Sequence, residues 1–385
     1  MLCNKCFRYK SLISFSIMTL IFFISCTKKI QIEKYLEPEN KWQSFGYDSS
    51  RNFYIRSDLK LPLKQKWEVE LEAGISHSSI TSISNFVCVA DLKGNVYFLN
   101  PEIGRILSKI SLKQPILTSV IVRERDLIVS LAETKNKKSQ LVLYDLLNGK
   151  VKKTFEVEGS IERELVLHKD FLIATTTSGR IYSLKYDLNK IWEIQLNEEL
   201  NCHPASSNNL FVTVSLKGNL FLVDMMIGKV LKKIKISSGV NSGISISNNL
   251  IYFGNSDGNF YCFTLDGSKV WQEKLKASVK AIPSIDDSSV FIGDLLGNVY
   301  AFDNKTGKKK WETSFGGMIN NSILVLNNQL IVPDSKGFIY VLEKLDGGLV
   351  QKIELKGRVK FSPVLVKNKV FIGYDDKKIA AYEND

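Results

Sequence analysis

Short apolar runs alternate with polar turns along most of the chain, and the clearest example is GNVYAFDNKTGKKKW at residues 297–311. Residues 299–302 are apolar and aromatic, a turn-forming segment follows, and residues 309–315 then alternate polar and apolar positions. This order predicts a strand, a hairpin turn and a second strand. Asp303 is expected to accept hydrogen bonds from backbone N–H groups of the turn, and Gly307 to adopt positive φ.

The same phrase recurs about every 40 residues. Its copies begin at Gly94, Ser139, Gly179, Gly218, Gly258, Gly297, Gly337 and Lys377. A repeat of this length that holds four short strands is typical of a propeller blade. The sequence therefore predicts an all-β fold, an eight-bladed β-propeller with four-stranded antiparallel blades, over residues 42–385.

The two ends of the repeat region are each incomplete. Residues 65–71, QKWEVEL, resemble the outer strand of the repeats but precede any blade of their own, whereas residues 358–385 supply only three strands. We therefore expect residues 65–71 to complete the last blade, so that both ends of the chain close one ring. Such closure removes the open seam, where unpaired backbone groups favour aggregation.

Each repeat is expected to begin with an inner strand that lines a central channel, where a cofactor site would be sought. By alignment, these strands lie at residues 75–82, 115–122, 160–167, 200–207, 239–246, 278–285, 317–324 and 358–365. Their acidic residues are Glu162 and Glu164, and His77 and His203 are their histidines. A calcium site requires several converging oxygen ligands. Two acids on one repeat do not supply them.

Residues 1–25 have the features of a lipoprotein signal peptide. Three basic residues are followed by an uncharged run at residues 11–25, shorter than the ~20 apolar residues that span a bilayer. Residues 23–26, FISC, resemble a bacterial lipobox, which predicts that Cys26 is diacylated and becomes the mature N-terminus. Phe23 departs from the usual leucine. Ordinary cleavage with Cys26 unmodified, or an uncleaved anchor, are the alternatives.

Residues 26–41 then form the lipidated cysteine and a polar tether. Multiple acyl chains form a durable anchor, because each buried CH₂ contributes about 0.8 kcal/mol. We therefore expect a bacterial cell-envelope protein, anchored by lipid in the outer membrane and facing the periplasm.

Charge adds little to this picture. The net charge is +12, and a surplus of about nine remains once the signal peptide is removed. Most of the basic residues are lysines scattered over turns, where they keep loops solvated and strand edges unpaired. With no recognised nucleic-acid motif or arginine-rich stripe, nucleic acid is not an expected partner.

Candidate chemistry is sparse. Cys88, Cys202 and Cys262 are an odd number in three different repeats, so no disulfide framework is expected. The three histidines lie in three repeats without metal-ligand spacing. Residues 254–258 match G-x-S-x-G, but strands flank them on both sides, which predicts a hairpin turn and not a nucleophile elbow. We predict no catalytic, cofactor-binding or metal-binding residue.

The repeat carries a recognisable resemblance. Ala301, Asp303, Thr306, Gly307 and Trp311 match the A-x-D-x-x-T-G-x-x-x-W phrase of the pyrroloquinoline-quinone-like propellers. The resemblance covers residues 42–385 and is specific for fold but not for activity. The tryptophans of the phrase are interpreted as packing between blades.

Two branches of that family differ in function. Quinoprotein dehydrogenases hold a quinone and Ca²⁺, whereas the BamB-type lipoproteins are non-catalytic propellers of the outer-membrane barrel-assembly machine. The chain is similar to the second branch in length, lipobox and blade count, and it lacks the first branch's adjacent cysteine pair and long insertions. The resemblance thus implies a monomeric protein-binding scaffold whose partners are envelope proteins. An envelope or surface propeller that binds a glycan or another protein, and a diverged quinone-dependent dehydrogenase, are the alternatives.

Overall fold

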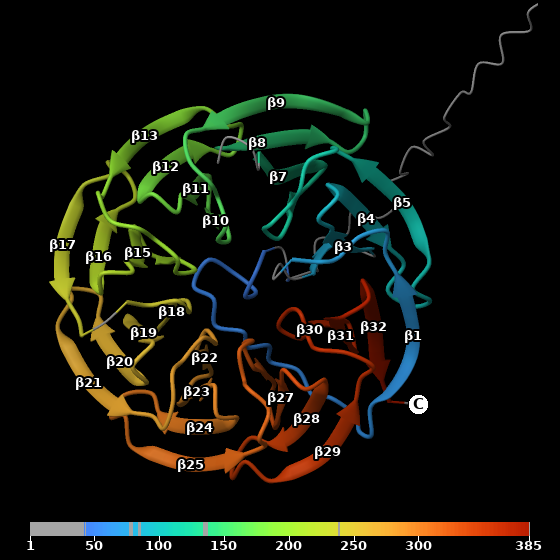
Figure 1. Cartoon of the computed structure of the whole chain (residues 1–385), viewed down its shortest axis with the longest axis vertical. Helices are drawn as coiled ribbons and strands as arrows, with labels where there is room; N and C mark the ends of the chain where they lie inside the picture. The colour runs from blue at the N-terminus through green and yellow to red at the C-terminus, as the bar shows by residue number, and fades with distance from the viewer. Residues whose placement is uncertain are drawn as a thin grey trace, which may run out of the picture.

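The computed structural model describes residues 42, 44–76, 80–83, 86–133, 138–237 and 239–384. Within these residues, 32 strands form eight four-stranded antiparallel sheets, arranged as the blades of a ring (Figure 1). The prediction of an eight-bladed all-β propeller is confirmed. The predicted signal peptide, Cys26, the whole tether and His77 lie outside the described residues.

Each blade runs from its inner to its outer strand in chain order. Blade 1 contains β2 (Thr81–Ile83), β3 (Phe86–Ala90), β4 (Asn95–Leu99) and β5 (Ile106–Ser111). Blade 2 contains β6 (Ile121–Arg123), β7 (Asp126–Glu133), β8 (Lys138–Asp145) and β9 (Lys150–Val157). Blade 3 contains β10 (Val166–His168), β11 (Phe171–Thr175), β12 (Arg180–Lys185) and β13 (Lys190–Gln195). Blade 4 contains β14 (Ala205–Ser207), β15 (Leu210–Val214), β16 (Asn219–Asp224) and β17 (Val230–Lys235).

The next three blades follow the same order. Blade 5 contains β18 (Ser245–Ser247), β19 (Leu250–Gly254), β20 (Asn259–Thr264) and β21 (Lys269–Lys274). Blade 6 contains β22 (Ser284–Ile285), β23 (Ser289–Gly293), β24 (Asn298–Asp303) and β25 (Lys309–Ser314). Blade 7 contains β26 (Leu324–Val325), β27 (Gln329–Pro333), β28 (Phe338–Glu343) and β29 (Leu349–Glu354). The middle two strands of each blade are almost wholly buried, because both of their faces pack against neighbouring blades.

Blade 8 is assembled from both ends of the repeat region. Its inner strands are β30 (Val364–Val366), β31 (Lys369–Tyr374) and β32 (Lys378–Glu383), and its outer strand is β1 (Lys64–Glu70). In the register of the two strands, Trp67 pairs with Ala381 and Val69 with Ile379. The predicted closure by an N-terminal strand is confirmed.

The inner strands are shorter than predicted. Each has only two or three residues, at or just beyond the end of the predicted range, and the described residues before it lie outside any named strand. A proline, which has no N–H to donate, stands immediately before three of them, at Pro204, Pro283 and Pro363. The channel is therefore lined largely by loops and not by strands.

The repeat glycines occupy equivalent places. Gly94, Gly179, Gly218, Gly258, Gly297 and Gly337 each stand directly before the third strand of a blade, with φ between 74 and 91°. In the next turn of blade 6, the Asp303 carboxylate accepts hydrogen bonds from the Thr306 backbone N–H at 2.9 Å and hydroxyl at 2.8 Å. Gly307 follows with φ of 73°.

Four tryptophans of the outer strands lock neighbouring blades together. The Trp271 indole Nε1 donates to the Asn304 carbonyl of the next blade at 3.2 Å, and its ring lies against Gly307. The same contact joins Trp67 to Gly104, Trp192 to Gly228 and Trp311 to Gly347. The glycine and the tryptophan of the repeat phrase are thus the two sides of one contact between adjacent blades.

We expect Gly307→Ala to destabilise the protein by roughly 2–5 kcal/mol. A Cβ there would lie 2.8 Å from ring atoms of Trp271, so overpacking of about 1–3 kcal/mol adds to about 1–2 kcal/mol of left-handed strain. The matched control is Gly149→Ala in blade 2, where φ is 65° but the nearest neighbouring atom is 3.8 Å away. The Gly149→Ala variant should lose only the stability that corresponds to left-handed strain, about 1–2 kcal/mol. Urea denaturation measures the free energy of unfolding of both variants. Equal losses of stability in the two would contradict the contact between Gly307 and Trp271 as a source of stability.

Candidate functional site

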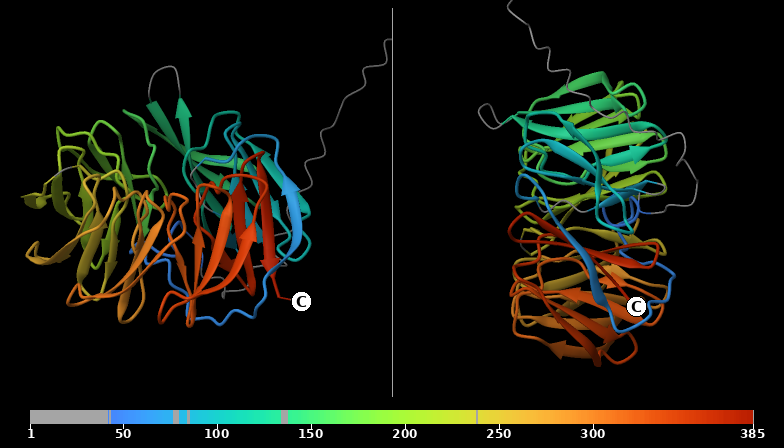
Figure 2. Two further views of the ribbon diagram at one scale, coloured as in Figure 1. Left: turned by 60° about the horizontal axis from the view of Figure 1, so that its bottom comes forward. Right: turned by 90° about the vertical axis from the view of Figure 1, so that its right-hand side faces the viewer.

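An N-terminal segment, residues 44–57, lies across one end of the central channel, and we call it the plug. Figure 1 shows it in blue at the centre of the ring, and Figure 2 shows it along one face. The backbone N–H groups of Ser206, Ile246, Ile285 and Val325 donate to the carbonyls of Ser49, Ser50, Asn52 and Phe53 at 2.8–2.9 Å. The plug therefore follows the inner edges of blades 4 to 7 in turn.

A buried arginine anchors the plug. The Arg51 side chain is 1% exposed and donates to the carbonyl oxygens of Phe45, at 3.0 Å, and of Pro204. Close by, the Glu164 carboxylate accepts hydrogen bonds from the Ser119 N–H at 2.8 Å and hydroxyl at 3.0 Å. Burial lowers the pKa of Arg51 to about 10 and raises the pKa of Glu164 to about 7. The attraction between the two charges shifts each pKa in the opposite direction, but burial has the larger effect. The plug is thus tied to blades 2, 3 and 4 through one desolvated charge cluster.

Glu164 is expected to make stability depend on pH between about 4.5 and 7. Its folded-state pKa of about 7 lies above its ordinary value of 4.5, so its contribution is fully present below pH 4.5 and is lost as pH rises through 7. The change amounts to about 3 kcal/mol. Burial lowers the pKa of His168, which acts in the opposite direction. Urea denaturation of the wild type and of Glu164→Gln across this range isolates the Glu164 effect, and parallel pH profiles would contradict it.

A cavity of about 360 Å³ occupies the channel beside the plug. It is lined by Phe45, Arg163, Asn201, His203, Asn241, Lys280, Ile282, Asn320, Asn321, Ser322 and Ser362. Phe45 comes from the plug, and its ring stacks on His203 with centroids 5.2 Å apart. The other residues come from blades 3 to 8, mostly from the irregular loops that precede the inner strands. The result is a polar cavity with an aromatic surface on the plug side.

A chain of hydrogen bonds connects three blades around this cavity. The Arg163 guanidinium Nε donates to Asn201 Oδ1 at 2.8 Å. Asn201 Nδ2 then donates to Asn241 Oδ1 at 3.1 Å, and Asn241 Nδ2 to Ser256 Oγ at 3.3 Å. Each amide is thereby oriented by its neighbour in the preceding blade.

Every described lining residue except Phe45 lies in a stretch predicted to line the channel; of the three described acids and histidines singled out there, His203 lines the cavity and Glu162 and Glu164 do not. Glu164 is buried against Ser119, and Glu162 is exposed and accepts a hydrogen bond from Ser160 at 3.2 Å. The important residues that sequence reasoning missed are Arg51 and Arg163. Neither arginine recurs at the matching position of the other repeats, so the repeat pattern could not mark either one as functional.

The cavity is a poor match for calcium-bound quinone chemistry. Its described lining contains no carboxylate, although Ca²⁺ favours several carboxylate and carbonyl oxygens. In the described part of the chain, no three His, Cys, Asp or Glu side chains gather as a metal-binding group. Cys88, Cys202 and Cys262 are buried thiols, free of disulfide bonds. The donor set therefore does not fit the cofactor of the dehydrogenase branch.

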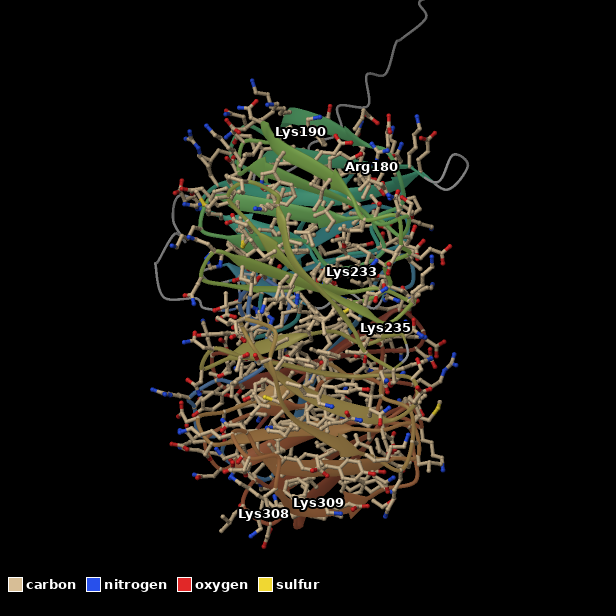
Figure 3. The ribbon with its side chains drawn as sticks, turned by 90° about the vertical axis from the view of Figure 1, so that its left-hand side faces the viewer. Arg180, Lys190, Lys233, Lys235, Lys308 and Lys309 are labelled. Atoms are coloured by element: carbon tan, nitrogen blue, oxygen red, sulfur yellow. The ribbon has the colours of Figure 1, made fainter. Side chains whose placement is uncertain are left out.

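The outer surface carries scattered lysines (Figure 3). Several of them are neutralised by local partners: Lys190 and Lys309 pair with Glu193 and Glu312 at 3.0 and 2.7 Å. Lys233 pairs with Glu198 at 2.6 Å. Such partly exposed pairs contribute little stability. Among the described residues, no helix is long and apolar enough to cross a membrane.

Comparison with known proteins gives the family. The family model described as outer membrane protein assembly factor BamB matches residues 64–266 and 263–385. The chain belongs to this BamB family. BamB of Burkholderia pseudomallei is 21% identical over 127 residues, 32% of this chain and 33% of that protein. Tetrathionate hydrolase of Acidithiobacillus ferrooxidans is 29% identical over 117 residues, 30% of this chain and 22% of the enzyme. The chain thus matches no more than about a third of either relative's length.

Solved structures share the fold at low identity. BamB from Moraxella catarrhalis has a TM-score of 0.70 at 17% identity, over 84% of this chain and 98% of that one. Quinohemoprotein alcohol dehydrogenase from Comamonas testosteroni has a TM-score of 0.74 at 9% identity, over 90% of this chain and 81% of the enzyme. An enzyme and a BamB therefore share the fold of this chain. The fold alone does not separate catalysis from binding.

Proposed function

We propose that this BamB-family protein is an exported, lipid-anchored, non-catalytic propeller that acts as a protein-binding scaffold in the assembly of outer-membrane β-barrel proteins. The observation that carries the proposal is the family match, which extends from β1 to the last residue of the chain. The lipobox-like residues 23–26 support anchoring through Cys26. The cavity supports a non-catalytic role, since its described lining offers no carboxylate to act as base or calcium ligand.

Partner recognition is assigned to blade-connecting loops on one face of the ring. The outer strands are less suited to strand addition, because lysines on exposed edges discourage pairing with another chain. In β17, for example, Lys232, Lys233 and Lys235 occupy exposed positions of the edge strand. Lys233 and Lys235 are labelled in Figure 3. Loops of a rigid ring can instead bind an extended segment or a loop of the partner.

The enzyme alternative predicts a different behaviour. The purified full chain, mixed with Ca²⁺ and pyrroloquinoline quinone, would retain the chromophore through gel filtration and oxidise alcohols or glucose with a dye acceptor. We expect neither result, because the channel lacks the carboxylate ligands. Retention of the quinone together with dye reduction would overturn the non-catalytic assignment.

Cross-linking in intact cells of the native host tests the scaffold role. Lysine-reactive cross-linking, isolation under denaturing conditions and mass spectrometry should recover the outer-membrane barrel-assembly protein. The cross-linked lysines would then identify the binding face. A Cys26→Ser variant is the matched control: it should fold, leave the membrane fraction and lose most of the cross-links. Recovery of other surface components alone, with the propeller open to protease on intact cells, would favour the ligand-binding alternative.

A further inference from the structure

The charged side chains that line the cavity beside the plug are all positive. Arg163 and Lys280 are the charged side chains of its described lining, which otherwise consists of asparagines, serines, His203 and two apolar side chains. Both acidic neighbours of Arg163 in sequence lie outside the described lining: Glu162 is exposed, and the Glu164 carboxylate is buried against Ser119. A concave surface that bears only positive charge concentrates anions, because its low-dielectric walls focus the field.

Arg163 is the more informative of the two cations. Its guanidinium is half-buried, yet within the described residues it makes no ion pair, and its Nε and Nη2 both donate to one neutral oxygen, Asn201 Oδ1. Burial lowers the pKa of Arg163. Partly desolvated cations are normally paired with an anion in folded proteins. Lys280 is exposed, and within the same residues no carboxylate lies within ion-pair distance of its ammonium.

We propose that this cavity binds a small anion that bears carboxylate or phosphate groups. Arg163 and Lys280 provide its positive charge, and the amides of Asn201, Asn241 and Asn320 provide hydrogen bonds to the polar atoms of the ligand. This site is additional to the scaffold function proposed above, which needs no small ligand.

The dimensions of the cavity limit the size of the ligand. Its volume of about 360 Å³ is near the lower end of the ~300–1,000 Å³ typical of ligand pockets. Phe45 of the plug stacks on His203 within the cavity wall, and Arg51 fixes the plug behind it. A compact anion therefore fits this cavity, with the plug forming one of its walls.

Citrate and inorganic phosphate are suitable probes for the two kinds of anionic group. Isothermal titration calorimetry of the full chain, in an uncharged detergent at low ionic strength, should show one site with a dissociation constant below about 1 mM for at least one of them. Glucose, which is neutral and of similar size, should not bind. Weaker binding at higher salt is expected for an electrostatic site.

Three variants test whether Arg163 and Lys280 bind the anion. Lys280→Gln and Arg163→Gln should each weaken binding of the preferred probe at least tenfold. Lys308→Gln is the control, because it removes the same charge from an exposed position on the outer rim (Figure 3) and should leave binding unchanged. Lys280 is exposed, so its variant tests the site even if Arg163→Gln does not fold. No detectable binding of either anion at 10 mM, or equal weakening in all three variants, would overturn the proposal.

Discussion

A chain that begins at residue 72 is expected to be unfolded or aggregated, because it lacks β1. Without this strand, blade 8 has no outer strand and the backbone edge of β32 is unpaired. The deletion also removes Trp67 and Leu71, which are 9% and 3% exposed, at a cost of roughly 1.5–3 kcal/mol each. The interlock between Trp67 and Gly104 disappears with them. Such losses are comparable to the whole stability of many domains, ~5–15 kcal/mol.

A chain that begins at residue 64 separates β1 from the plug. It keeps the closing strand but loses residues 44–57, so it should remain a folded, monomeric ring with reduced stability. Circular dichroism and gel filtration of both shortened chains, beside a chain that begins at residue 42, provide the measurement. A cooperative, monomeric ring in the chain that begins at residue 72 would show that β1 is dispensable for closure.

Much of this fold could be predicted from sequence because it depends on local chemistry that is repeated. The period, the turn glycines and the outer-strand tryptophans each recur, so that eight weak signals support one another. One further turn also repeats along the chain. The buried Asp294 carboxylate accepts a hydrogen bond from the Tyr300 hydroxyl at 2.8 Å, and Asp91 with Tyr97 forms the same contact. The D-x-x-G-N-x-Y phrase could have revealed it.

The plug and the cavity could not be predicted in this way, because both depend on contacts between residues far apart in sequence. Arg51 binds carbonyls more than 100 residues away, and nothing in its neighbourhood marks it as buried. The cavity residues lie in loops that were expected to be strands. All of the described lining residues except Phe45 fall within the stretches predicted to line the channel, but the repeat pattern did not indicate which of their side chains face the cavity.

The Arg51→Met variant is expected to lose about 3–5 kcal/mol at pH 8. Methionine fills similar space but leaves the buried carbonyls of Phe45 and Pro204 without their donor, and it leaves the Glu164 carboxylate without its positive neighbour. Removal of one member of a buried charge cluster typically costs this much. The free energy of unfolding in urea measures the loss. Arg105→Met is the control, because Arg105 is exposed, and its effect should stay within about 0.5 kcal/mol.

The double variant Arg51→Met with Glu164→Gln tests whether the electrostatic part of this loss comes from Glu164. If it does, the double variant is more stable at pH 8 than Arg51→Met alone, because no uncompensated charge remains buried. At pH 5 the Glu164 carboxyl of the wild type is already protonated, since its pKa is about 7, so the advantage of the double variant should largely disappear. The remaining loss at pH 5 then measures the unpaired carbonyls. An advantage of the same size at both pH values would mean that Arg51 acts through the carbonyls alone, and that the plug is held by hydrogen bonds without a contribution from charge.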